Sequence, residues 1–144
     1  MKKEITNQDW KNIKPSHEKL WVWQKANNLH LNIYKICKTL PLTEKYNLRY
    51  QIERSSKSVK DNIAEGNESY YFKDKMKAFY IARKEASETQ NHLRDFESKK
   101  YLASTQCQEM IDIYEEIKRG INGLIKRTRY KQDVFNNKGS KNLT

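Results

Sequence analysis

Apolar residues recur every three or four positions along four long segments of this chain, and this spacing limits the folds that the chain can adopt. The first segment has the spacing 4, 3, 4, 3 and 4 through Val22, Ala26, Leu29, Ile33, Ile36 and Leu40. Such spacing gathers apolar side chains on one face of an α-helix, where a neighbouring helix can cover them. No segment alternates apolar and polar residues over the length of a strand, so we expect no β-sheet.

Short breaks separate the four segments. Pro41 follows the first segment, a polar patch follows Gly66 at the end of the second, and Ser104 precedes the fourth. Proline cannot continue a helix and serine commonly caps one, so these residues mark helix ends. We expect helices at about 20–40, 44–67, 72–98 and 104–129.

Long helices joined by short connections lie antiparallel to their sequence neighbours. The sequence therefore predicts an all-α fold, an antiparallel up-down-up-down four-helix bundle over residues 17–130. Gly66 and other small residues of the second helix leave room for the backbone of another helix to approach closely. Outside the bundle we expect a ragged N-terminal arm over 1–16 and a flexible basic tail over 131–144.

The chain has no apolar run of the roughly 20 residues that a membrane-spanning helix needs. Residues 4–20 also lack the apolar core of a signal peptide. We therefore expect a cytoplasmic protein in which Cys37 and Cys107 are reduced and buried as small apolar side chains. The first helix is basic and amphipathic, but the bundle needs its apolar face, so we expect no membrane partner.

Residue types that commonly carry catalysis are scattered along the chain. His17, His30 and His92 form no H-E-x-x-H pattern, and the two cysteines are far apart. Only four glycines are present, and none belongs to a phosphate-binding loop motif. The sequence predicts neither a catalytic residue nor a metal site nor a cofactor, and we expect a protein that is not an enzyme.

Three polar residues lie beside the apolar stripes of the second and third helices: Asn62, Glu65 and Glu88. A carboxylate-bridged metal site in a helical bundle would use Glu-x-x-His pairs, and the sequence contains none. We interpret the three residues as a structural polar network that ties the second helix to the third or to a neighbouring subunit.

The positive charge is concentrated in two of the four helices. The chain has 29 Lys and Arg against 18 Asp and Glu, a formal net charge of +11. Residues 19–43 contain four lysines and no acid, and residues 118–132 contain six basic residues and no acid. The first and last helices are neighbours in such a bundle, so we expect one shared basic surface. Its candidate nucleic-acid-binding residues are Lys25, Lys35, Lys38, Lys118, Arg119, Lys126, Arg127, Arg129 and Lys131.

A basic surface of this size is typical of proteins that bind a polyanion. The sequence predicts that the protein binds RNA or DNA through phosphate contacts with little sequence specificity. The alternative is that the lysines and arginines are merely solvated. Tyr70, Tyr71 and Phe72 lie next to Lys73 and Lys75, where aromatic rings either stack on unpaired bases or close the end of the bundle.

Several short motifs resemble one protein family in the same order along the chain. Residues 20–26 (L-W-V-W-Q-K-A) resemble its L-x-V-W-Q-x-A opening, and residues 62–66 (N-I-A-E-G) its N-I-A-E-G core. Residues 123–126 (G-L-I-K) resemble its closing motif, and Tyr71 stands where the family often has serine. The family is that of the bacterial four-helix bundle proteins, also called ribosomal RNA intervening-sequence proteins. The resemblance implies a four-helix bundle that assembles as a homopentameric ring.

A more distant resemblance connects the chain to the accessory variability determinant proteins of retroelements. Members of that group are basic pentamers that bind a reverse transcriptase and nucleic acid. This resemblance implies the alternative function of a protein-interaction adaptor, for example an accessory subunit of a reverse transcriptase or of another neighbouring enzyme.

Overall fold

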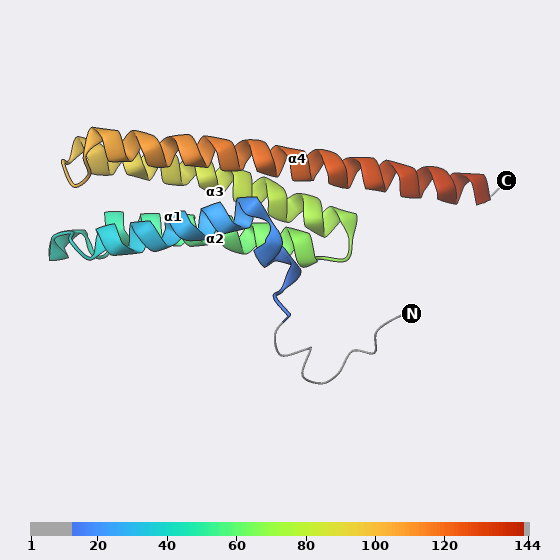
Figure 1. The fold of residues 1–144 in the computed structure, drawn as a ribbon, viewed down its shortest axis with the longest axis horizontal. Helices are drawn as coiled ribbons and strands as arrows, with labels where there is room; N and C mark the ends of the chain where they lie inside the picture. Colours follow the sequence, from blue (N-terminus) through green and yellow to red (C-terminus); the bar gives the residue numbers. More distant parts are fainter. Residues whose placement is uncertain (1–12, 143–144) are drawn as a thin grey trace.

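The computed structural model describes residues 13–142, and over that range it contains helices and turns but no strand. The four long helices are α1 (Trp21–Cys37), α2 (Leu48–Glu68), α3 (Phe72–Ser98) and α4 (Ser104–Asn142). Two short 3₁₀ helices, η2 (Ser16–Lys19) and η3 (Leu42–Glu44), precede α1 and α2. Figure 1 shows α1 and α2 side by side in one layer and α3 and α4 in the other. The predicted all-α four-helix fold is confirmed, and the pentamer stays a prediction.

The apolar stripes of the four helices meet along the axis of the bundle. In α1 the predicted stripe residues Val22, Ala26, Leu29 and Ile33 are each at most 2% exposed. The third and fourth helices contribute larger side chains, among them Phe96 and Tyr114, to the same core. Burial of these side chains supplies most of the free energy that holds the helices together, because an isolated helix of this length is only marginally stable in water.

The four helix pairs do not pack equally. The interface between α2 and α3 is the most extensive, and the interface between α1 and α4 is the least. Gly66 of α2 faces the ring of Phe79 of α3, whose nearest atom would lie 2.5 Å from a Cβ at this position. The space at Gly66 is therefore filled by an aromatic side chain rather than by the backbone of another helix, which differs from the expectation drawn from the sequence.

Two helix boundaries differ from the predicted ones. The chain after Pro41 forms η3, so α2 begins at Leu48 rather than near 44. Helix α4 continues to Asn142, so the prediction that it ends near 129 was wrong. No proline interrupts residues 131–142, and Phe135 lies against Phe72 of α3 with 6.0 Å between ring centroids. An existing helix extends readily over such residues because each added residue gains a hydrogen bond.

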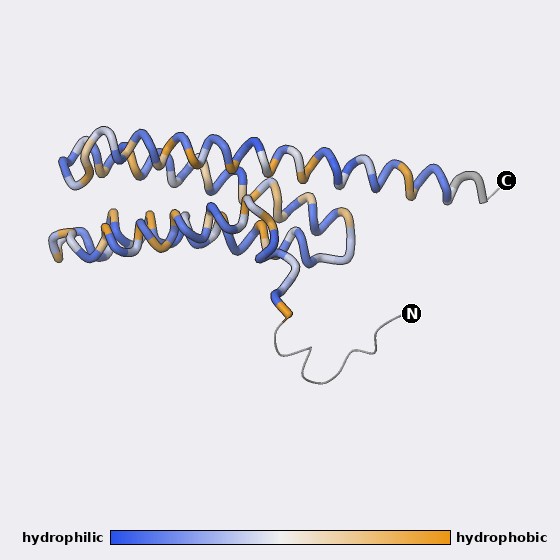
Figure 2. Tube along the Cα trace, in the orientation of Figure 1, coloured by the Kyte–Doolittle hydropathy of each residue, from blue (hydrophilic) through white to orange (hydrophobic). Residues whose placement is uncertain are grey.

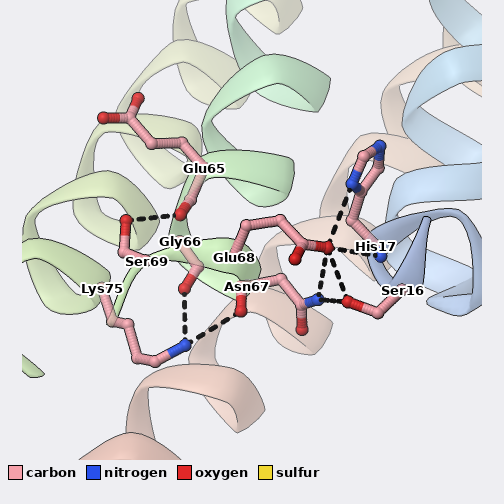
Figure 3. Close-up of polar contacts among 8 residues, drawn as sticks. All are labelled: Ser16, His17, Glu65, Gly66, Asn67, Glu68, Ser69 and Lys75. Carbon is pink, nitrogen blue, oxygen red and sulfur yellow. Dashed lines mark hydrogen bonds and ion pairs between the residues drawn. The ribbon is translucent and has the colours of Figure 1, made fainter. Parts of the chain in front are cut away.

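The turn η2 is fastened to the end of α2 by a cluster of hydrogen bonds. The Ser16 hydroxyl donates to Glu68 Oε1 at 2.6 Å, the His17 backbone N–H donates to the same oxygen at 3.1 Å, and Asn67 donates to Ser16 Oγ at 2.8 Å (Figure 3). The Ser16 hydrogen bond, with those from His17 and Asn67, lowers the pKa of Glu68 to about 2. Ser16 therefore contacts the bundle, whereas residues 1–12 of the predicted arm lie outside the described residues.

Candidate nucleic-acid interface

The antiparallel packing of α1 on α4 determines where the predicted basic residues lie. Trp21 and Val22 at the start of α1 lie against Gly120 of α4, where an added Cβ would meet both side chains. From this level α1 runs about 25 Å to Lys38, and α4 runs about 13 Å the other way to Arg129. Lys38 is therefore separated from Arg129 by about 40 Å along the bundle, and Lys35 from Lys126 by about 30 Å. The predicted basic residues of α1 and α4 are therefore spread along the bundle and do not gather at one place.

Carboxylates pair with two of the three predicted basic residues between these two ends. Lys25 Nζ forms an ion pair with Glu116 at 2.8 Å, and Lys118 Nζ forms one with Glu115 at 2.8 Å. Arg119 borders a shallow groove between α1 and α4 that also contains Asp112 and Glu116. The middle of the α1–α4 seam thus has little excess positive charge.

The second half of α4 instead meets the first half of α3 and gathers cations there. Arg83 of α3 donates to Asn122 Oδ1 of α4 at 2.8 Å, and further along Phe72 lies against Phe135. We define the α3–α4 basic surface as the six residues Lys75, Arg83, Lys126, Arg127, Arg129 and Lys131. Within the described range, none of the six forms an ion pair with a carboxylate, although Asp74 and Asp133 lie on the same helices.

Three of these cations surround a small pocket of about 50 Å³ between the two helices: Lys75, Arg127 and Lys131. Lys75 Nζ donates to the backbone oxygens of Gly66 at 3.1 Å and Asn67 at 2.9 Å, at the C-terminal end of α2 (Figure 3). Burial lowers the pKa of Lys75, and the positive charges of Lys131 and Arg127 lower it further, partly offset by Glu68. The like charges repel one another, so a bound anion would stabilise this arrangement.

Tyr80 of α3 holds two arginines of the same surface. The Arg129 guanidinium donates to the Tyr80 hydroxyl, and its carbon lies 5.8 Å from the ring centroid. The Arg83 guanidinium carbon lies 5.0 Å from the same ring. Both contacts have the geometry of cation–π interactions, which orient a guanidinium without neutralising its charge.

Comparisons with known proteins agree with this architecture. A crystal structure of a protein of unknown function from the S23 ribosomal protein family of Bacteroides thetaiotaomicron superposes with a TM-score of 0.67 and 27% sequence identity. The match covers 73% of this chain and 95% of the other chain. A search of the curated proteins found no match. Residues 18–123 match the family described as 23S rRNA-intervening sequence protein.

The chain belongs to this family.

The family match ends at residue 123. Four of the six residues of the α3–α4 basic surface, those at positions 126–131, therefore lie beyond the part that identifies a 23S rRNA-intervening sequence protein. After residue 123, α4 continues beside the start of α3 and then projects past the other three helices (Figure 1). The projecting part is mostly hydrophilic (Figure 2).

The candidate residues chosen from the sequence did not include Arg83 or Lys75, which α3 brings to the surface, although Lys75 was noted beside the aromatic residues 70–72. The sequence does show an excess of positive charge in the third helix, because residues 73–100 carry eight basic side chains against five acidic ones. What the sequence could not indicate is which half of α3 lies beside the basic half of α4.

The three residues of the predicted polar network do not lie together. Glu88 Oε2 accepts a hydrogen bond from Arg54 of α2 at 3.1 Å, and Arg54 also lies 3.7 Å from Glu85. Burial raises the pKa of Glu85, while a hydrogen bond with Glu85 lowers the pKa of Glu88. Glu88 therefore helps to tie α2 to α3 in this 23S rRNA-intervening sequence protein.

The other two members of that set make local contacts. Asn62 Nδ2 donates to the backbone oxygen of Ser58 in its own helix at 2.9 Å. The backbone oxygen of Glu65 accepts from Ser69 Oγ at 2.6 Å, while its side chain points away from the Glu68 cluster (Figure 3). Asn62 and Glu65 line a groove with Asp74, separate from Glu88.

Over residues 13–142, no three His, Cys, Asp or Glu side chains lie close enough together to hold a metal ion. Cys37 and Cys107 are both buried free thiols, and burial raises the pKa of each. Among the described helices none is long and apolar enough to cross a bilayer.

Proposed function

We propose that this protein is a non-enzymatic helical-bundle protein that binds RNA or DNA through phosphate contacts, with little sequence specificity. The observation that carries the proposal is the α3–α4 basic surface, whose six cations lack carboxylate partners in the described chain. Phosphate contacts of lysine and arginine give affinity without reading the bases. Such ligands are present in the cytoplasm, the compartment that the sequence predicts.

The proposal differs from the prediction made from the sequence in its choice of residues. Lys126, Arg127, Arg129 and Lys131 keep their predicted role, and Lys75 and Arg83 join them. Lys25 and Lys118 contribute less, because an ion pair with a glutamate competes with a phosphate for each ammonium group. Arg119, Lys35 and Lys38 lie on other parts of the bundle and serve as comparison sites.

The dependence of affinity on salt tests this function. Binding of a fluorescent oligonucleotide is measured by anisotropy between 50 and 200 mM salt. Three to six phosphate contacts on a single strand release enough counterions to weaken binding by about 20- to 300-fold over this range. An absence of binding to RNA and DNA at 50 mM salt, or an affinity that does not change with salt, would contradict the proposal.

We also propose that five copies assemble as a homopentameric ring, as the family resemblance implies. Helix α1 leaves two large apolar side chains uncovered, since Trp21 is 48% and Leu31 is 49% exposed. A second subunit would cover them. Light scattering is expected to give a mass five times the 17.3 kDa of one chain. A mass of one chain at micromolar concentration would refute the ring.

The same uncovered side chains favour the second candidate, a protein-interaction adaptor such as an accessory subunit of a reverse transcriptase. A single chain in solution would leave Trp21 and Leu31 free for a different protein. A stoichiometric partner that stays bound after nuclease treatment would then support the adaptor over the nucleic-acid binder.

A further inference from the structure

The α3–α4 basic surface continues into exposed aromatic side chains. Arg127, Lys131 and Phe135 are four residues apart in succession, so they lie along one face of α4. Phe135 is 67% exposed, and its only aromatic contact within the described chain is Phe72, which lines the cationic pocket. A ring this exposed contributes little to the core of the bundle.

The turn between α2 and α3 adds two more rings at this end of the bundle. Tyr70 is 87% exposed and Tyr71 is 67% exposed, and both directly precede Phe72. Their rings meet edge to face, with centroids 5.1 Å apart. Three elements, the α2–α3 turn, the start of α3 and the second half of α4, thus present aromatic rings at the end of the bundle that contains the cationic pocket.

The pocket itself can accept one phosphate. An ammonium group has three N–H donors, and Lys75 uses two of them on the backbone oxygens of Gly66 and Asn67. The third donor remains for a ligand, and Arg127 and Lys131 on the opposite wall supply further donors. Phe135 follows Lys131 by one turn of helix, about 6 Å, which is comparable to the separation between the phosphate and the base of one nucleotide.

We infer that the ligand of this surface is an unpaired strand: one phosphate lies among Lys75, Arg127 and Lys131, and the adjoining base stacks on Phe135. The inference rests on the proposed function and names its substrate class. Base–aromatic stacking is tolerant of sequence, because every base has a π-face. In a duplex the bases are already stacked on one another, so a duplex could use the cations but not Phe135.

The test compares a single-stranded oligonucleotide containing 2-aminopurine with a duplex of the same sequence at 50 mM salt. The wild-type protein is expected to bind the single strand more tightly and to quench its fluorescence. Phe135→Ala is expected to weaken single-strand binding by about 5- to 100-fold, leaving duplex binding and the salt dependence unchanged. Phe135→Trp keeps an aromatic ring and is expected to retain tight binding.

Tyr46→Ala provides the matched control. Tyr46 is 84% exposed at the opposite end of the bundle and has Lys45 5.3 Å from its ring centroid, so it is also an exposed ring beside a lysine. Replacing Tyr46 by alanine is expected to change the affinity for neither the single strand nor the duplex. Circular dichroism checks that both alanine variants stay folded.

Each other outcome has a distinct meaning. Equal binding of single strand and duplex, unchanged by Phe135→Ala, would overturn the inference and leave the proposed function standing. If Phe135→Ala weakened the binding of single strand and duplex equally, the inference would also be overturned, because stacking on Phe135 is available only to unpaired bases. Failure of the wild-type protein to bind either ligand would overturn the proposed function itself.

Discussion

Reversing two charges at the cationic pocket, Arg127→Glu with Lys131→Glu, is expected to weaken binding of both RNA and DNA on the order of 30-fold at 50 mM salt. Each reversal replaces an attraction of about 1 kcal/mol to a phosphate 4 Å away in water by a repulsion of similar size. Two reversals therefore change the binding free energy by about 4 kcal/mol before screening. Screening by salt reduces this to about half, and about 1.4 kcal/mol corresponds to a tenfold change in affinity.

The control for this experiment carries the same change in net charge at a different place. Lys35→Glu with Lys38→Glu also replaces two exposed cations by two carboxylates, about 30 to 40 Å away along the bundle. Each pair of reversals lowers the formal charge from +11 by four, because each reversal removes one positive and adds one negative charge. The affinity of the control for the oligonucleotide is expected to fall by less than about fivefold, since exposed charges farther from the bound strand than a Debye length are largely screened.

Anisotropy titrations of the two double variants therefore separate a local site from the overall charge of the protein. Similar losses in both would mean that binding follows net charge and that no local site exists. Unchanged affinity in Arg127→Glu with Lys131→Glu would remove the pocket from the interface. Thermal unfolding followed by circular dichroism checks both variants, because Lys38 caps the C-terminal end of α1, where the helix dipole favours a cation.

Gly66→Ala is expected to lower the free energy of unfolding by up to about 2 kcal/mol, although glycine-to-alanine changes usually stabilise a helix. Three ring atoms of Phe79 would lie between 2.5 and 3.0 Å from the new Cβ. Phe79 is only 3% exposed, so its ring has little room to move. Overpacking of a core costs about 1–3 kcal/mol, and the gain of about 1 kcal/mol in helix propensity does not offset the upper part of that range.

Gly123→Ala is the matched control in α4. No atom lies within 4 Å of a Cβ at Gly123, so only the helix propensity changes and stability is expected to rise by up to about 1 kcal/mol. Thermal unfolding should thus show shifts of opposite sign for the two variants. Adding Phe79→Leu to Gly66→Ala should restore part of the loss, because it removes the ring that the Cβ meets. A stabilised Gly66→Ala variant would show that the α2–α3 contact is not as tight as described.

The sequence alone determined the helices and the residues that they bury. Val22, Ala26, Leu29 and Ile33 lie in the core because helical periodicity is a local property, set by 3.6 residues per turn and readable without any partner. The motifs at residues 20–26 and 62–66 likewise identified the family without structural information. The C-terminal end of α4 was predicted too early because lysine and asparagine occur in both helix and coil. The contact of Phe135 with Phe72, which lies far away in the sequence, could not be predicted from the residues around Phe135.

Only the tertiary structure decided which charges meet. Lys25 faces Glu116, 91 positions along the chain, whereas Lys75 faces Arg127 and Lys131. These encounters depend on the axial register between helices, which the core packing of Gly120 against Trp21 and of Gly66 against Phe79 helps to set. The sequence around a charged residue on a helix surface does not predict its partner, because water solvates either charge at any exposed position. The location of the basic surface therefore follows from how the helices pack.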